Sequence, residues 1–177
     1  LLMQRDFDWR GSEAEFERAV ELAPANVEAL FQLGVARASQ GDLVQAVELT
    51  RKALKVDPLN VFGIQWLAGY LLPLGRLDEA EAAIRKAIEL KPDWRFNHYL
   101  LAVSQVLRND STGAQKAADA EPAGPWQDFS LALAAQSGAD SAAADATLKD
   151  SIERYSDGWA FQIAQIYAVR GEPDQMF

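Results

Sequence analysis

A phrase of six residues ending in proline occurs three times in this chain, at residues 19–24, 53–58 and 87–92. The spacing between successive prolines is 34 residues. Aligning them defines two complete adjacent units, 27–60 and 61–94. Repetition at a fixed period of this length indicates a stack of similar units, each contacting its neighbours, and excludes one undivided globular core.

Each unit is expected to form two helices. In the first half of 27–60, apolar and small residues recur at intervals of three or four, which is a helical period: Val27, Leu30, Leu33 and Gly34. Gly41 and Asp42 then combine a helix stop with a helix start. A second helix is expected from about Leu43 to Lys55, and Pro58 ends it.

The positions of the large and small residues resemble the tetratricopeptide repeat (TPR) family. Unit 61–94 matches the family pattern throughout, with Ile64, Leu67, Ala68, Leu71, Ala80, Ile84, Ala87 and Pro92. Unit 27–60 supplies Leu30, Leu33, Gly34, Ala46, Ala53 and Pro58, and departs from the pattern at Arg37 and Thr50. The resemblance implies an all-α fold, a right-handed superhelical solenoid of antiparallel helix pairs.

The flanking residues follow the same pattern less closely, and we expect a single TPR domain over 1–177. It would hold about five units and be incomplete at both ends. Residues 1–26 read as the end of a first helix followed by a second helix. The unit after Arg95 is about one helical turn short. The expected units are 1–26 (partial), 27–60, 61–94, 95–124 (shortened), 125–156 and 157–177 (partial).

The resemblance also implies where a partner would bind, because the first helices of TPR units line a concave groove. Eight of the seventeen aromatic residues fall at groove positions: Phe31, Phe62, Trp66, Phe96, Tyr99, Trp126, Phe129 and Phe161. Three amides fall beside them and are expected to hydrogen-bond a partner backbone: Gln32, Gln65 and Gln162. The alternative for some of these rings is simple packing between adjacent helices. A clamp for a C-terminal carboxylate is not expected, because Phe31 and Val35 replace the Lys and Asn it requires.

The expected partner is therefore a protein or peptide, with an amphipathic helix as the best guess for the bound segment. An alternative is self-assembly into a homo-oligomer through the open ends of the array. Residues 152–172 resemble the last repeats of TPR regions attached to bacterial nucleotide cyclases and winged-helix transcriptional regulators. That resemblance implies a regulatory or scaffolding part of a larger bacterial protein.

Enzymatic and metal chemistry find little support in the sequence. The chain has no Cys and a single His, and it lacks the phosphate-loop, dinucleotide, zinc-protease and nucleophile-elbow motifs. We expect no catalytic residue, no metal ligand and no cofactor, and we expect His98 to be a structural imidazole. A site made of carboxylates alone is the remaining enzymatic alternative. The net charge of −9 argues against nucleic acid or anionic lipid as the main partner.

Two segments have a second interpretation. The uncharged run 58–75 could be taken for a membrane span, but the repeat explains it better and no membrane contact is expected. Residues 109–153 hold thirteen Ala and a net charge of −6, from two Lys and eight acidic residues. They are interpreted as thin, closely packed helices with a solvated acidic face, or alternatively as a docking patch for a basic partner. No signal peptide is visible and Cys is absent, so a cytoplasmic location is expected.

Overall fold

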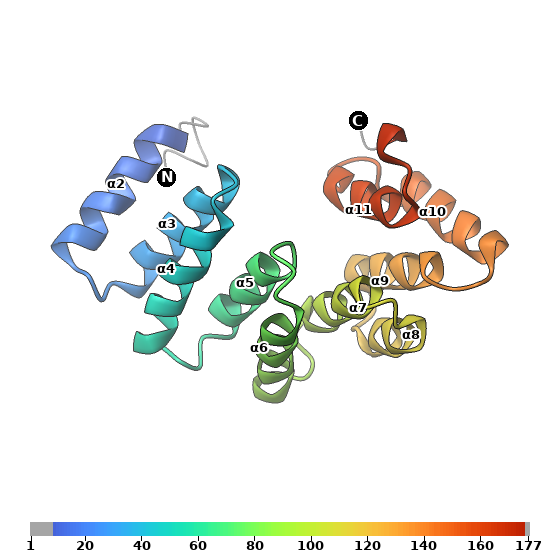
Figure 1. The fold of residues 1–177 in the computed structure, drawn as a ribbon, viewed down its shortest axis with the longest axis horizontal. Helices are drawn as coiled ribbons and strands as arrows, with labels where there is room; N and C mark the ends of the chain where they lie inside the picture. The colour runs from blue at the N-terminus through green and yellow to red at the C-terminus, as the bar shows by residue number, and fades with distance from the viewer. Residues whose placement is uncertain (1–8, 176–177) are drawn as a thin grey trace. The chain divides into compact units, whose positions relative to one another are not determined.

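The computed structural model describes residues 9–175 (Figure 1). Over this part of the chain it contains ten α-helices, one short 3₁₀ helix and no strand, so the predicted all-α class is confirmed. The chain divides after Leu90 into two compact units, which we call unit 1 and unit 2. Each is described by itself below.

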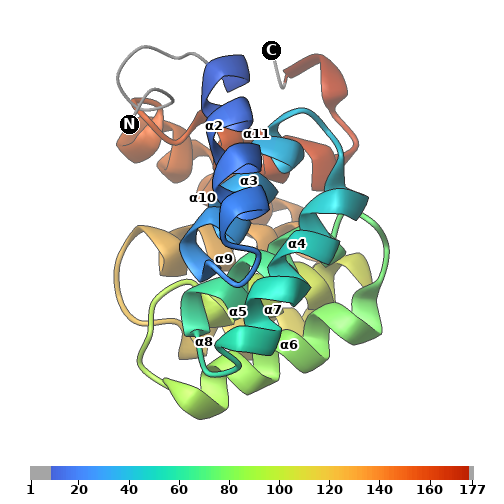
Figure 2. The ribbon, with the colours of Figure 1, turned by 90° about the vertical axis from the view of Figure 1, so that its left-hand side faces the viewer.

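Unit 1 contains one helix followed by two helix pairs. The helices are α2 (Trp9–Leu22), α3 (Val27–Ser39), α4 (Leu43–Val56), α5 (Val61–Leu71) and α6 (Leu77–Leu90). The pairs α3–α4 and α5–α6 coincide with the two predicted complete units. Helix α2, the predicted second helix of residues 1–26, packs against α3 (Figure 2). The end of a first helix that was predicted before it lies outside the described residues.

Short polar and glycine residues set the helix ends of unit 1. The side chains of Asn26, Asp42 and Asn60 accept hydrogen bonds of 2.9–3.1 Å from backbone N–H groups in the first turns of α3, α4 and α5. Such caps satisfy donors that have no partner within the helix. Gly41 and Gly75 follow α3 and α5 with φ of +85° and +69°, a left-handed conformation that side chains disfavour.

The positions at which the repeat pattern requires large or small residues form the core of unit 1. Ala46, Ala53, Ala80 and Ala87 are fully buried, and their size lets neighbouring helices approach closely. Larger side chains fill the space beside them, including the cluster of Leu30, Phe31, Leu33 and Leu49. The pattern of large and small residues is therefore a packing pattern.

Both departures from the repeat pattern have a local explanation. Arg37 stands where an apolar residue is usual, and its guanidinium pairs with Glu13 at 2.5 Å and with Glu17, both on α2. Thr50 is buried, and its hydroxyl lies 3.3 Å from the point where a Cβ on Gly34 would be. The two residues thus join α2 to α3 and α3 to α4.

Glycine allows α3 and α5 to meet at one point. A Cβ on Gly63 would lie 2.6 Å from Cε1 of Phe31 and closer still to its Cζ, inside any real contact distance. The Phe31 ring is buried and therefore occupies the space that a side chain at residue 63 would need. Gly69, six residues further along α5, meets no other described residue within 4 Å of its corresponding point, apart from its own chain neighbours and helix backbone.

Unit 2 contains two helix pairs and a further helix. These are α7 (Asn97–Leu107), α8 (Ser111–Ala120), α9 (Pro125–Gln136), α10 (Ser141–Tyr155) and α11 (Ala160–Arg170), followed by the 3₁₀ helix η1 (Pro173–Gln175). Helix α8 has ten residues whereas α4 and α6 have fourteen. The difference of four residues is about one helical turn, and it falls in the unit 95–124 for which a shortened repeat is predicted.

The shortened repeat caps its first helix from a distance. Phe96 precedes α7 with a left-handed φ of +81° and gives it no side-chain cap. Instead the buried carboxylate of Glu121, just after α8, accepts hydrogen bonds from the N–H groups of Phe96 at 2.6 Å and Tyr99 at 2.8 Å. Because α8 is one turn shorter, its end brings Glu121 to the start of α7.

The membrane-span interpretation of 58–75 is not supported. The run consists of a loop, the eleven residues of α5 and a turn. No helix in the part of the chain described is long and apolar enough to cross a bilayer.

Candidate functional site

The aromatic side chains gather on the first helix of each pair. We call these A helices (α3, α5, α7, α9 and α11) and the second helices B helices (α4, α6, α8 and α10). The B helices α4, α6 and α8 contain no aromatic residue, and α10 has only Tyr155, at its end. The exception among second helices is α2, the second helix of residues 1–26, which holds Trp9 and Phe16. Phe31 lies on α3, three further rings lie on α5, and most of the remainder lie on or next to the A helices of unit 2. The A helices therefore carry the candidate site, and the two units are taken in turn.

Three rings form a ladder along α5. Phe62, Trp66 and Tyr70 follow one another at intervals of four residues, and neighbouring ring centroids are 5.7 Å apart in both steps. Phe62 is 56% exposed, Trp66 is half-buried and Tyr70 is buried. The Tyr70 hydroxyl has no hydrogen-bond partner among the described residues, and burial raises the pKa of this phenol. We call Phe62, Trp66 and Tyr70 the α5 ladder.

A carboxylate lies on the neighbouring A helix of unit 1. Glu28 is exposed in the first turn of α3, and one of its oxygens accepts a 2.7 Å hydrogen bond from the amide of Gln32. Glu28 and Gln32 occupy the same repeat positions on α3 that Phe62 and Trp66 occupy on α5. Phe31 lies between them in sequence and is the residue that contacts Gly63.

Unit 2 holds a larger group of rings in mutual contact, which we call the aromatic cluster. Phe96 stacks on Tyr99 with centroids 5.3 Å apart, and Trp126 contacts both at 4.5 and 5.0 Å. Trp159, just before α11, lies 5.0 Å from Trp126 and 5.4 Å from the ring of Phe129. Tyr155 completes the group against Phe129 and Trp159. The cluster therefore runs across α7, α9 and the start of α11.

Buried rings make the floor of the cluster and half-buried rings make its surface. Tyr99 and Phe129 are buried, and the Tyr99 hydroxyl donates a 2.5 Å hydrogen bond to the amide oxygen of Gln165 on α11. Phe96, Trp126 and Trp159 are half-buried. Burial raises the pKa of Tyr99, so its hydroxyl remains a donor over the physiological pH range.

Tyr155 at the edge of the cluster is tied to a charged pair. Its hydroxyl donates to the carboxylate of Asp128, which also pairs with Arg154 at 2.8 Å. Desolvation, followed by the hydrogen bond to Asp128, raises the pKa of Tyr155. These contacts fasten the end of α10 to α9.

The predicted binding residues divide by exposure. Phe62 and Phe161 are exposed, at 56% and 70%. Five others are half-buried and keep part of their side chain at the surface: Gln32, Trp66, Phe96, Trp126 and Gln162. The last four are buried: Phe31, Gln65, Tyr99 and Phe129. These four side chains pack between helices, which is the alternative given above for some of the rings. A partner cannot reach them without displacing other side chains.

Two members of the aromatic cluster are absent from the predicted set. Trp159 and Tyr155 lie outside the repeat positions that face a TPR groove, and Trp159 precedes its helix. The only sequence signal that marks them is a local density of rings within five residues. That signal indicates packing but does not say which other rings are contacted.

His98 is half-buried on α7, as expected for a structural imidazole, and its Nδ1 atom has no partner among the described residues. Over the same residues, no three acidic or histidine side chains come together as a metal site would require.

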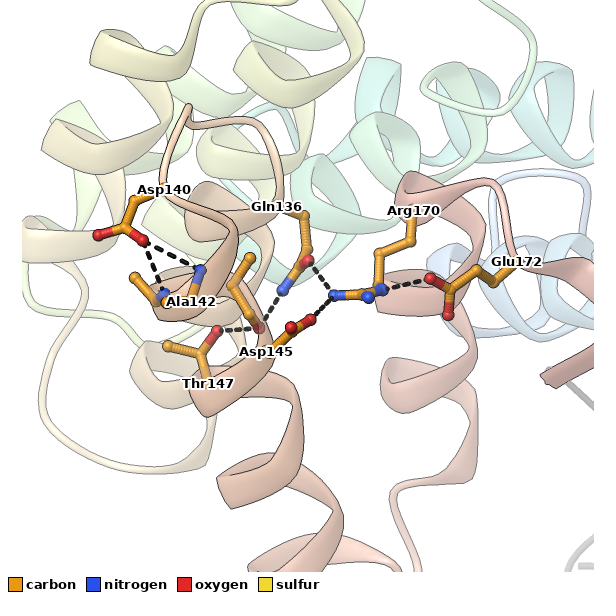
Figure 3. Close-up of polar contacts among 9 residues, drawn as sticks. Gln136, Asp140, Ala142, Asp145, Thr147, Arg170 and Glu172 are labelled. Carbon is orange, nitrogen blue, oxygen red and sulfur yellow. Dashed lines mark hydrogen bonds and ion pairs between the residues drawn. The ribbon is translucent and has the colours of Figure 1, made fainter.

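A polar network in unit 2 joins α11 to the preceding pair (Figure 3). The Arg170 guanidinium donates to the side chains of Gln136 at 3.1 Å, Asp145 at 2.8 Å and Glu172 at 2.9 Å. The amide of Gln136 in turn donates to the carbonyl of Ala144 on α10. One arginine at the end of α11 therefore contacts both α9 and α10.

Replacing Arg170 with methionine should loosen α11 selectively. Methionine keeps most of the aliphatic stem, so the change removes the hydrogen bonds and ion pairs with little loss of packing. We expect faster amide hydrogen exchange in α11 and unchanged exchange in α3 to α6, measured by mass spectrometry. Arg85→Met is the control, because in the described part of the chain Arg85 pairs with a residue of its own helix, Glu81. Equal exchange in α11 of the two variants would contradict this role.

Comparison with family models identifies the repeats. Residues 27–60 match one model described as a tetratricopeptide repeat, and residues 64–93 match another with the same description. The predicted TPR repeats are thereby confirmed in this part of the chain. A curated relative, the "Protein CTR9 homolog" of Arabidopsis thaliana, is 29% identical over 105 residues. The match covers 59% of this chain but only 10% of that protein.

Solved structures with the same fold are similar over nearly the whole chain. A tetratricopeptide repeat protein from Parabacteroides merdae matches 98% of this chain and 72% of its own, with a TM-score of 0.71 and 16% identity. YrrB, described as a TPR protein with an unusual peptide-binding site, matches 92% of this chain and 87% of its own. Its TM-score is 0.57 and its identity 15%. At such identities the likeness establishes the solenoid fold of stacked helix pairs.

Proposed function

We propose that this chain, which carries tetratricopeptide repeats at residues 27–60 and 64–93, is a non-catalytic module that binds a segment of a partner protein. Repeats of this kind generally serve protein interaction and scaffolding. Each unit has its own binding surface, the exposed part of its A helices: Phe62, Trp66 and Gln32 in unit 1, and Phe96, Trp126, Phe161 and Gln162 in unit 2. The buried residues Phe31, Gln65, Tyr99 and Phe129 support it from beneath.

The observation that carries this proposal is the uneven distribution of aromatic side chains. A helices need apolar residues to pack, but packing does not require that Phe62 and Phe161 be more than half exposed. Exposed aromatic side chains gathered on one set of helices are typical of recognition surfaces. The peptide-binding site described for YrrB, which has the same fold, supports the same use.

The chain spans about a tenth of the curated relative it matches. We propose that it is the regulatory or scaffolding part of a larger bacterial protein, beside a domain that supplies another activity. Its cytoplasmic location remains a prediction from the absence of cysteine. Self-assembly through the ends of the array remains the alternative, and a chain that used only this mode would bind its own copies and not displayed peptides.

Removing one exposed ring tests the proposal. The immobilised chain is panned against a library of displayed random peptides, and affinities of the enriched peptides are measured by fluorescence anisotropy. We expect Phe62→Ala or Phe161→Ala to weaken binding about tenfold, because a central aromatic anchor contributes a large share of the affinity. Far-UV circular dichroism should be unchanged, since both rings are largely exposed.

Val44→Ala is the matched control, because Val44 is equally exposed but lies on the B helix α4. It should leave the affinity unchanged. The proposal fails if no peptide is enriched, or if every enriched peptide binds the two Phe variants as tightly as the unchanged chain.

A further inference from the structure

One carboxylate stands alone on the A helices of unit 1. Helices α3 and α5 carry two charged residues between them, Glu28 and Arg37, and α5 carries none. Arg37 is neutralised by Glu13 and Glu17. Glu28 takes a hydrogen bond only from the uncharged Gln32, and no basic side chain of the described residues pairs with it. This face therefore has one negative charge with a free carboxylate oxygen and no compensating cation.

An open apolar stripe lies on the neighbouring helix. Phe62, Trp66, Gly69 and Pro73 follow one another along α5 and its end at helical spacing, and none of them is buried. The ring of Phe62 meets Trp66 edge to face, at an interplanar angle of 79°. Among the described residues, no atom beyond the backbone and chain neighbours of Gly69 lies within 4 Å of the point where its Cβ would be, so space is open beside Trp66.

The charge and the rings lie on two helices that meet at one side-chain contact. Phe31, the residue before Gln32, reaches Gly63, the residue after Phe62, so α3 and α5 are neighbours at this level. A cation about 3 Å from a carboxylate oxygen can also lie within about 6 Å of the centroid of a ring on a neighbouring helix.

We infer that the partner segment presents an arginine side chain to this face, where its guanidinium pairs with Glu28 and lies over the rings of Trp66 and Phe62. The inference rests on the proposed function and names the chemistry of its ligand. Arginine fits better than lysine because its planar guanidinium stacks on rings and offers donors to a carboxylate at the same time. Apolar residues beside the arginine would cover Phe62 and the space at Gly69.

Short peptides of defined sequence test the inference on the full chain. The probes are N-acetylated, C-amidated pentapeptides, Ala-Leu-X-Leu-Ala, in which X is arginine, lysine, citrulline or glutamate. Citrulline has nearly the shape of arginine without its charge. Binding is followed at millimolar peptide by ¹H–¹⁵N NMR through the indole N–H of Trp66, which a Trp66→Phe spectrum assigns. We expect the arginine peptide to bind about fivefold more tightly than the citrulline peptide, and the glutamate peptide to bind least.

Glu28→Gln should remove the difference between the arginine and citrulline peptides, because it keeps the shape of residue 28 and removes its charge. Glu48→Gln is the control, since Glu48 is exposed on the B helix α4, and it should preserve the difference. Trp66→Ala, followed through the backbone N–H of Phe62, should weaken binding of both peptides.

Three results would overturn the inference and leave peptide binding in place. These are equal affinity for arginine and citrulline, equal affinity for arginine and lysine, or an arginine preference that survives Glu28→Gln. If none of the four peptides shifts the Trp66 signal while panned peptides still bind, this face is not the binding surface and the inference fails alone. If panned peptides also fail to bind, the proposed function fails with it.

Discussion

Replacing Glu121 with alanine is expected to lower the free energy of unfolding by about 2–4 kcal/mol, among the largest effects of any single substitution in unit 2. The carboxylate is buried and accepts hydrogen bonds from the N–H groups of both Phe96 and Tyr99. Alanine leaves two donors at the start of α7 without this partner, and the Tyr99 donor is buried away from water. Urea denaturation followed by circular dichroism and by tryptophan fluorescence measures the change.

Two further variants separate this cause from a general loss of charge. Glu121→Gln keeps one acceptor oxygen but turns an amide N–H₂ towards the second donor, so an intermediate loss is expected. Glu89→Ala removes an exposed acidic side chain at the end of α6 and should change stability by less than about 0.5 kcal/mol. A Glu121→Ala chain as stable as Glu89→Ala would show that another group caps α7.

Replacing Gly63 with alanine should destabilise unit 1 by about 1–3 kcal/mol, because the new methyl group would overlap the ring of Phe31. The overlap involves Cζ and Cε1 of a buried aromatic ring, which cannot turn aside as the end of a flexible chain would. To make room, α3 and α5 must separate. Urea unfolding, with stability compared at the transition midpoint, measures the loss.

Gly69→Ala is the control within the same helix. Its methyl group meets nothing within 4 Å, so only the better helix propensity of alanine remains, and stability should rise by about 0.5–1 kcal/mol. Combining Gly63→Ala with Phe31→Leu tests the cause, because leucine has no atoms where Cζ and Cε1 stand. The double variant should lose less than the sum of the two single changes. Simple additivity, or stabilisation by Gly63→Ala, would contradict this account.

The repeat period could be predicted from the sequence because it is carried by packing positions. Small residues such as Ala46 and Ala80 must be small wherever two helices meet, and prolines mark the ends of the B helices. The pairs α3–α4 and α5–α6, and the missing turn in α8, follow from counting these positions. Family models match in the same place, at residues 27–60 and 64–93.

The candidate site was less predictable, because exposure depends on what lies opposite a side chain. Phe31 and Phe62 are both aromatic residues at groove positions, yet Phe31 is buried under Gly63 while Phe62 is exposed. The burial of Phe31 depends on Gly63, a glycine 32 residues away. The periodic pattern of the sequence does not predict that these two residues are in contact. Glu121 looks like any acidic residue in an alanine-rich segment, and only the fold reveals that its carboxylate accepts two hydrogen bonds from N–H groups at the start of α7.

The distant cap on α7 also bears on the order in which the chain can assemble. Helices α3 and α5 receive their caps from Asn26 and Asn60, the residues immediately before them, so each can start to form as soon as its own segment exists. Helix α7 lacks its acceptor until residue 121 is in place, 25 positions after Phe96. During synthesis, unit 1 can therefore fold before α7 forms a stable helix. Helices α7 and α8 should then form together in one cooperative step.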